Sequence, residues 1–108
     1  MTTFICQLPN LDDRRFFLWS LTTDSPTTVL LTRTQVAEVY QERFGVEVPP
    51  ESWVALDETG SDCPWAKNLE ELFFDNRWGE DETEVEPDDL ISRLVCLTAA
   101  RNGEGVDL

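Results

Sequence analysis

The chain has 108 residues, of which 22 are acidic, eight are basic and none is His. The formal net charge of −14 disfavours direct binding to nucleic acid or to anionic membranes, and it favours encounter with basic surfaces. Hydrophobic residues make up 41% of the chain, with four Trp and six Phe, which argues against wholesale disorder and predicts a single domain over residues 1–108. The acidity is uneven, because residues 57–108 carry fifteen acids and four bases, whereas residues 1–56 carry seven acids and four bases.

The sequence also indicates where the protein acts. No apolar run reaches the roughly 18–20 residues that a membrane helix needs. The first residues show no basic stretch followed by an apolar one, so we expect no secretory signal and a cytoplasmic protein. The cysteines, Cys6, Cys63 and Cys96, are odd in number and widely spaced, and apolar neighbours predict that they are buried free thiols.

The N-terminal third predicts strands. Residues 2–8 alternate loosely and predict a strand that Pro9 and Asn10 end. Residues 15–21 form a short apolar run, which fits either a buried strand or a helix that begins at Asn10 or Asp12. The strand is favoured, because a turn-like segment (22–28) separates it from a β-branched run at 28–32 that can return as its hairpin partner.

The middle of the chain predicts one clear helix over residues 34–44. Thr32 or Thr34 can cap its start, and Gly45 stands where a helix end requires a positive φ angle. The prolines at 49 and 50 then break the helix, and residues 52–58 are expected to add a strand. The apolar stripe of this helix consists of Val36, Val39, Tyr40 and Phe44.

Two more helices are predicted in the acidic half. The first begins at Ser61 or Asp62, with Pro64 in its first turn, and the second begins near Pro87 and ends at Gly103 or Gly105. Together the elements predict an α+β fold: a single small domain with a mostly antiparallel sheet and about three helices. The buried faces are expected to be Trp65, Leu69, Leu72 and Phe73 in the first helix and Leu90, Ile91, Leu94, Val95 and Leu97 in the second.

Catalytic and metal sites are not indicated. The chain lacks His, the commonest general base, and it contains no nucleophile or phosphate-binding motif, so we expect no enzyme and no cofactor. Gly79 precedes the acids instead of lying among them as in a calcium-binding loop, and no close Cys pair suggests zinc. Residues 31–39 have the rhythm of a helix-turn-helix opening, but the segment after them is acidic and disfavours DNA binding.

The densest acidic run is the strongest candidate site. Seven of the ten residues from Glu80 to Asp89 are acidic, and Asp88 and Asp89 suit the first turn of a helix. Carboxylates at alternate positions would stand about 6.6–6.8 Å apart if the run were extended, which would form a row similar to an array of phosphates. Trp78 either anchors a partner or packs in the core. The predicted partner-binding residues are Glu70, Glu71, Asp75, Trp78, Glu80, Asp81, Glu82, Glu84 and Glu86.

The stretch ELFFDNRWGEDETEVEPDD (71–89), together with the charge of −14, resembles in general character the small acidic phage and mobile-element inhibitors of bacterial defence, namely anti-CRISPR proteins and other DNA mimics. The stretch VYQERFGVEVPPE (39–51) is a lesser similarity. The resemblance implies a non-catalytic inhibitor in the host cytoplasm. It would occupy the basic nucleic-acid-binding surface of a defence complex, such as a CRISPR effector. The alternative is a small acidic structural or accessory subunit of a phage or bacterial assembly, which binds through an apolar patch near Trp19, Trp53 or Trp78.

Overall fold

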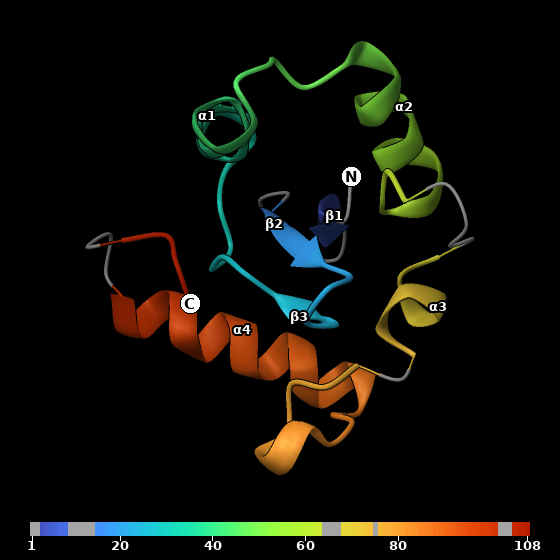
Figure 1. Cartoon of the computed structure of the whole chain (residues 1–108), viewed down its shortest axis with the longest axis vertical. Helices are drawn as coiled ribbons and strands as arrows, with labels where there is room; N and C mark the ends of the chain where they lie inside the picture. The colour runs from blue at the N-terminus through green and yellow to red at the C-terminus, as the bar shows by residue number, and fades with distance from the viewer. Residues whose placement is uncertain (1–2, 9–14, 64–67, 75, 102–104) are drawn as a thin grey trace.

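The computed structural model describes residues 3–8, 15–63, 68–74, 76–101 and 105–108. The sheet has the order β1-β2-β3 and is antiparallel throughout. It lies in the middle of the molecule, with helices on both sides (Figure 1). The predicted α+β class is therefore confirmed. The elements are β1 Thr3–Leu8, β2 Arg15–Ser20, β3 Ser25–Pro26, α1 Arg33–Phe44, α2 Pro50–Thr59, α3 Leu69–Phe73, a turn of 3-10 helix at Glu80–Glu82, and α4 Pro87–Arg101.

The central strand β2 is buried on both faces. Phe17 and Trp19 point into a core shared with α3 and α4, whereas Phe16 and Leu18 point into a core shared with α1 and α2. A strand that is covered on both sides reads as a continuous apolar run without polar alternation. This explains why residues 15–21 also fitted a helix, and the strand prediction is confirmed. The predicted strand over 2–8 is likewise present as β1.

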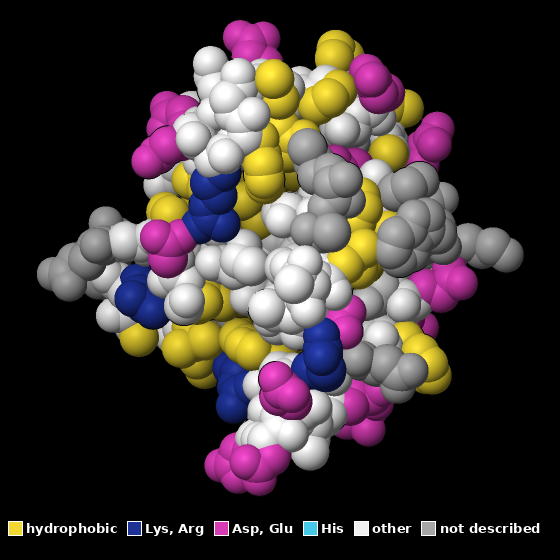
Figure 2. Space-filling view, viewed as in Figure 1, with side chains coloured by type: hydrophobic (Ala, Val, Ile, Leu, Met, Phe, Trp, Pro, Cys, Tyr) yellow, Lys and Arg dark blue, Asp and Glu magenta, His cyan; other side chains and the backbone are white. Residues whose placement is uncertain are grey.

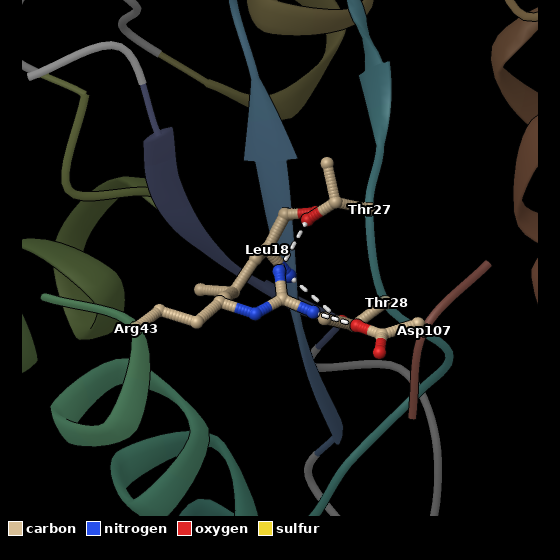
Figure 3. Close-up of polar contacts among 5 residues, drawn as sticks. All are labelled: Leu18, Thr27, Thr28, Arg43 and Asp107. Atoms are coloured by element: carbon tan, nitrogen blue, oxygen red, sulfur yellow. Dashed lines mark hydrogen bonds and ion pairs between the residues drawn. The ribbon is translucent and has the colours of Figure 1, made fainter. Parts of the chain in front are cut away.

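The return of the hairpin contains an irregular segment. Trp19 pairs with Pro26 and Phe16 pairs with Leu31, so β2 advances by three residues while its partner advances by five. The fully buried Thr28 fills the gap, because its Oγ1 accepts the Leu18 N–H at 3.1 Å (Figure 3). The predicted partner segment 28–32 does face β2. The regular strand is limited to β3, because after Pro26 the Leu18 N–H bonds to the Thr28 side chain and not to a backbone carbonyl.

Short segments cover both edges of the sheet. On the outer edge of β1, the Gln7 N–H donates to the Gly60 carbonyl at 2.8 Å and the Asp62 N–H donates to the Ile5 carbonyl at 3.2 Å. Unpaired edge groups are templates for aggregation, so this pairing protects the strand as well as joining α2 to it.

The C-terminal residues cover the opposite edge. The Val29 N–H donates to the Val106 carbonyl at 2.9 Å. Arg43 of α1 reaches the same place, where its guanidinium donates to Thr27 Oγ1 at 3.2 Å and forms an ion pair with Asp107 (Figure 3). One arginine therefore joins α1, the hairpin return and the end of the chain.

The helix predicted over 34–44 is confirmed as α1. Thr32 Oγ1 accepts the Gln35 N–H at 3.2 Å, and Gln35 Oε1 accepts the Thr32 N–H at 2.9 Å, which forms a reciprocal cap. Gly45 ends the helix with a φ of 72°. Val36 and Tyr40, one turn apart, are its buried residues.

The strand predicted over 52–58 is wrong, because these residues belong to α2. Pro49 is extended and Pro50 occupies the first turn, where a missing N–H costs nothing. Ser52 and Leu56 are buried one turn apart, which is a helical spacing. A helix thus does follow α1, but its sequence PESWVALDET contains no Lys or Arg. The charge argument against a DNA-reading helix therefore holds for the helix that is present.

The helix predicted from Ser61 or Asp62 begins later, at α3. Asn68 caps it, since its Oδ1 accepts the Glu71 N–H at 2.9 Å. Ser61 instead pairs with Cys6 in a β-bridge, so the need to cover the edge of β1 overrides the local helix signal. Leu72 and Phe73 are buried as expected and Leu69 is partly buried, whereas Pro64 and Trp65 lie outside the described residues.

The helix predicted near Pro87 is confirmed as α4, which buries Leu90 and Leu94 fully. Two side chains of α4 that were predicted to be buried are exposed. Val95 is 42% exposed and the Cys96 thiol is exposed, because both follow Leu94 around the helix and away from the core. Cys6 and Cys63 are buried free thiols, as predicted.

We expect Thr28→Val to lower the free energy of unfolding by about 1–3 kcal/mol, because it keeps the shape of the side chain but leaves the buried Leu18 N–H without an acceptor. Urea unfolding followed by tryptophan fluorescence measures the loss. Thr27→Val is the control, since Thr27 Oγ1 lies 3.5 Å from the Leu18 carbonyl and accepts an exposed hydrogen bond from Arg43 at 3.2 Å, and losing both contacts leaves no buried group unpaired and should cost about 1 kcal/mol or less. Equal losses for the two variants would contradict the role of Thr28.

Candidate functional site

The acidic loop, residues 79–86, connects the end of α3 to α4 and is closed by one buried side chain. Asn76 is 1% exposed. Its Nδ2 donates to the carbonyls of Phe73 at 2.9 Å and Val85 at 2.7 Å. Its Oδ1 accepts the N–H groups of Val85 at 3.0 Å and Trp78 at 3.3 Å. A single amide thus joins both ends of the acidic loop to α3.

The tip of the acidic loop is a tight turn. The Gly79 N–H donates to the Thr83 carbonyl at 2.7 Å, and the Thr83 N–H donates to the Glu80 carbonyl at 3.1 Å. A Cβ on Gly79 would lie 2.5 Å from Thr83 Oγ1, so only glycine permits this closure. Asp81 and Glu82 adopt positive φ angles of 54° and 61°, a conformation that costs non-glycine residues roughly 1 kcal/mol or more each.

This turn changes the expected spacing of the carboxylates. The extended row over Glu80, Glu82, Glu84 and Glu86 does not form, because residues 80–82 coil into a 3-10 turn. The side chains nevertheless face solvent: Glu80, Asp81, Glu82, Glu84 and Glu86 are all exposed. The acids are therefore exposed, but they do not form the predicted linear array.

Trp78 belongs largely to the framework of the loop. Its side chain is partly buried against the core shared with α3 and α4. Arg93 of α4 lies over the ring, 4.9 Å from its centre, and donates to the Trp78 carbonyl at 2.8 Å. Of the two interpretations of Trp78, packing is the one for which the structure supplies contacts.

Arg77 joins the base of the acidic loop to the hairpin turn. Its N–H donates to the Asp24 carbonyl at 3.0 Å, its Nε lies 3.1 Å from Asp24 Oδ2, and its guanidinium donates to the Thr22 carbonyl at 2.8 Å. The base of the acidic loop is therefore held to residues 22–24 by Arg77 and to α4 by Arg93.

The acids of α3 lie just before the loop in the chain. Glu70 and Glu71 are exposed in its first turn, as predicted, where negative charge also stabilises the helix dipole. Asp75 lies outside the described residues. Figure 2 shows acidic side chains at the lower end of the view, where the segment before α4 lies in Figure 1.

Phe74 is a surface residue that the sequence prediction missed. It is 73% exposed, the largest exposed fraction among the big apolar side chains that the structure describes. It follows the fully buried Phe73 at the end of α3, between the acids of α3 and the acidic loop. Phe74 is the residue after the last turn of α3 and its backbone is extended, so its side chain leaves the face that Leu72 and Phe73 bury, and the apolar sequence alone gave no signal of this.

The groups with shifted pKa values lie elsewhere, at the outer edge of β1. Burial raises the pKa of the Asp62 carboxyl, and hydrogen bonds from the Ile5 N–H, at 2.7 Å, and from Ser52 offset part of this effect. Burial raises the pKa of the Cys6 thiol well above its usual value, and the charge of Asp62 adds to this. A protonated, buried thiol is a poor nucleophile, so this cluster is structural.

Within the described ranges, no group of three or more Cys, Asp or Glu is arranged to hold a metal ion. In the same part of the chain, no helix has both the length and the apolar character that a membrane span requires. No family model, curated protein or solved structure matches the chain.

Asn76→Ala is expected to lower the free energy of unfolding by about 2–3 kcal/mol, because it removes the partners of buried backbone groups at both ends of the acidic loop. It should also speed amide hydrogen exchange at Val85. Urea unfolding and exchange measured by NMR test both effects. In the control, Asn68→Ala, an exposed cap is lost, which should cost about 1 kcal/mol and leave exchange at Val85 unchanged. Unchanged exchange in Asn76→Ala would contradict the role of Asn76.

Asp62→Asn is expected to equal or exceed the parent protein in stability at neutral pH, because the amide keeps an acceptor for the Ile5 N–H and removes a buried charge. A raised pKa in the folded state means that the parent gains stability as the pH falls through that pKa. The advantage of Asp62→Asn should therefore shrink on acidification and be absent below about pH 3.9, the ordinary pKa of Asp.

Urea unfolding of the parent and of Asp62→Asn across this pH range measures the difference. The control is Asp62→Ala, which leaves the Ile5 N–H unpaired and should be less stable than the parent at every pH. A difference between the parent and Asp62→Asn that grows on acidification would contradict the assignment.

Proposed function

We propose that the protein is a non-catalytic inhibitor that binds another protein through the acidic loop and the acids of α3. The partner is a protein with a basic nucleic-acid-binding surface, such as a CRISPR effector complex, and the inhibitor resembles anti-CRISPR DNA mimics in its mode of action. It would bind no nucleic acid and no membrane itself, and it would act in the cytoplasm, which is the host cytoplasm if a phage encodes it.

One observation carries this proposal: the acidic loop holds a fixed shape while its carboxylates face solvent. Asn76 holds the loop through the backbone of Val85, Arg93 holds its base through Trp78, and Arg77 joins that base to Thr22 and Asp24 of the hairpin turn. A surface that is already ordered loses less entropy on binding, so more of its interaction energy appears as affinity.

The arginines strengthen the same argument. Arg43 and Arg77 form ion pairs with Asp107 and Asp24, and Arg93 packs on Trp78. None of these pairs uses an acid of the loop or of α3. Arg43, Arg77 and Arg93 therefore stabilise the fold through Asp107, Asp24 and Trp78.

Phe74 supports the second candidate function, an accessory subunit of a phage or bacterial assembly that binds through an apolar contact. A side chain that is 73% exposed can anchor a partner by burial, and such a contact depends little on salt. The two functions thus differ in which substitutions remove binding and in how binding responds to ionic strength.

We expect Glu80, Glu82, Glu84 and Glu86 changed together to Gln to weaken binding of the partner by about 30-fold, which corresponds to four exposed contacts of about 0.5 kcal/mol each. Raised salt should weaken the parent complex similarly, because exposed charges are screened. A tagged pull-down from bacterial lysate at two salt concentrations identifies the partner, and titration of the purified pair measures the affinity.

The matched control changes Glu42, Glu47, Glu51 and Glu58 to Gln, which removes the same charge from α1, α2 and the segment between them. This variant should keep the partner. If binding survives the loop substitutions and high salt but is lost in Phe74→Ser, the accessory-subunit function replaces the proposal. If both sets of Gln substitutions weaken binding equally, only the net charge matters and the loop is not the binding surface.

A further inference from the structure

A hollow lies between α1 and the start of α2, near the other end of the molecule. This α1–α2 groove has a volume of about 430 Å³, within the range of known ligand sites. Its apolar lining comes from Ala37, Val48 and Trp53, and Glu38 and Glu47 also line it. Figure 2 shows apolar side chains gathered between α1 and α2, with acidic side chains around them.

Trp53 gives the groove a rigid aromatic wall. Its ring packs edge-on against the buried Phe16 at a centroid distance of 5.7 Å, and Arg33 lies over the ring, 4.3 Å from its centre. The ring is only partly buried, so part of it faces the groove. A tryptophan fixed from two sides presents apolar area with little loss of side-chain freedom on binding.

Two exposed valines are sequence neighbours of residues that line the groove. Val46 is 54% exposed and Val54 is 57% exposed. Val46 lies in the connection that also supplies Glu47 and Val48, and Val54 follows Trp53 on α2. The connection between the helices and the exposed side of α2 therefore both offer branched apolar side chains beside residues that line the groove.

The charges around the groove select its occupant. Arg33, which lines the groove, is already engaged with Trp53, and α2 contains no Lys or Arg. A second copy of the chain would bring acids against acids, and a nucleic acid would bring phosphates against them, so both are disfavoured. An amphipathic helix with a basic polar side satisfies both the apolar floor and the acidic rim.

We propose that the α1–α2 groove binds an amphipathic basic helix of a partner protein. The apolar side of that helix packs on Trp53 and Val48, and its Lys or Arg side chains reach Glu38 and Glu47. This surface is separate from the acidic loop: α1 and α2 lie at the top of Figure 1 and the segment before α4 lies at the bottom. The inference therefore stands or falls independently of the proposed function.

The test uses a fluorescein-labelled amphipathic peptide of Leu and Lys as the probe, with fluorescence anisotropy measured against the full chain at physiological salt. A scrambled peptide of the same composition, whose Leu residues do not share one side, is the peptide control. We expect the amphipathic peptide to bind at least about tenfold more tightly than the scrambled one, and the Trp53 indole N–H signal in NMR to shift on binding.

Substitutions distinguish binding of the peptide in the groove from its general attraction to an acidic protein. Glu38→Lys with Glu47→Lys, both at exposed positions, should weaken binding by about tenfold, and Ala37→Ser, at a residue that lines the groove, should weaken it at unchanged charge. The variant with Gln at Glu80, Glu82, Glu84 and Glu86 should bind the peptide as the parent does. The proposal is overturned if neither peptide binds, if both bind equally, or if the loop variant loses binding instead. Dimerisation of the free protein through this face in sedimentation experiments would also overturn it, because a second copy would then be the occupant.

Discussion

Burial of β2 on both faces is the constraint on which the rest of the structure depends. Its residues alternate between two cores, so two helical layers are needed to cover them. The helices of these layers each bury few side chains fully, Val36 and Tyr40 in α1 and Leu90 and Leu94 in α4. The outer sides of these helices remain in solvent, so they can carry the many acidic residues of the chain.

The few arginines explain how such an acidic chain stays compact. Arg43 bonds to Asp107, and Arg77 bonds to the carbonyl of Thr22, in each case across more than half of the sequence. Each contact joins a loop or terminus to a helix or hairpin, so the bases act where the chain would otherwise open. The acids are left to face outward, where their mutual repulsion is screened by salt. Low salt should therefore strengthen attraction to basic partners and also oppose compactness.

Local signals predicted the elements that depend on local chemistry. The reciprocal cap at Thr32, the positive φ of Gly45 and the acids after Pro87 lie where the sequence placed helix ends. The wrong predictions concern segments whose conformation depends on contacts with residues far away in the sequence. Residues 60–62 pair with β1 because its edge needs a partner, so the helix capped at Ser61 does not form. The exposed acids at 80–86 were recognisable by composition, but their turn depends on Asn76, whose role appears only once Phe73 and Val85 are brought together.

The conformation of the acidic loop likewise depends on residues that flank it. A loop of like charges would expand by repulsion if nothing held it. Asn76 and Arg77 hold its base, and Gly79 and the Thr83 hydroxyl, which donates to the Glu80 carbonyl at 2.8 Å, hold its tip. Repulsion among the exposed acids opposes this shape, so neutral substitutions in the loop should stabilise the fold, most strongly at low salt where the charges are least screened.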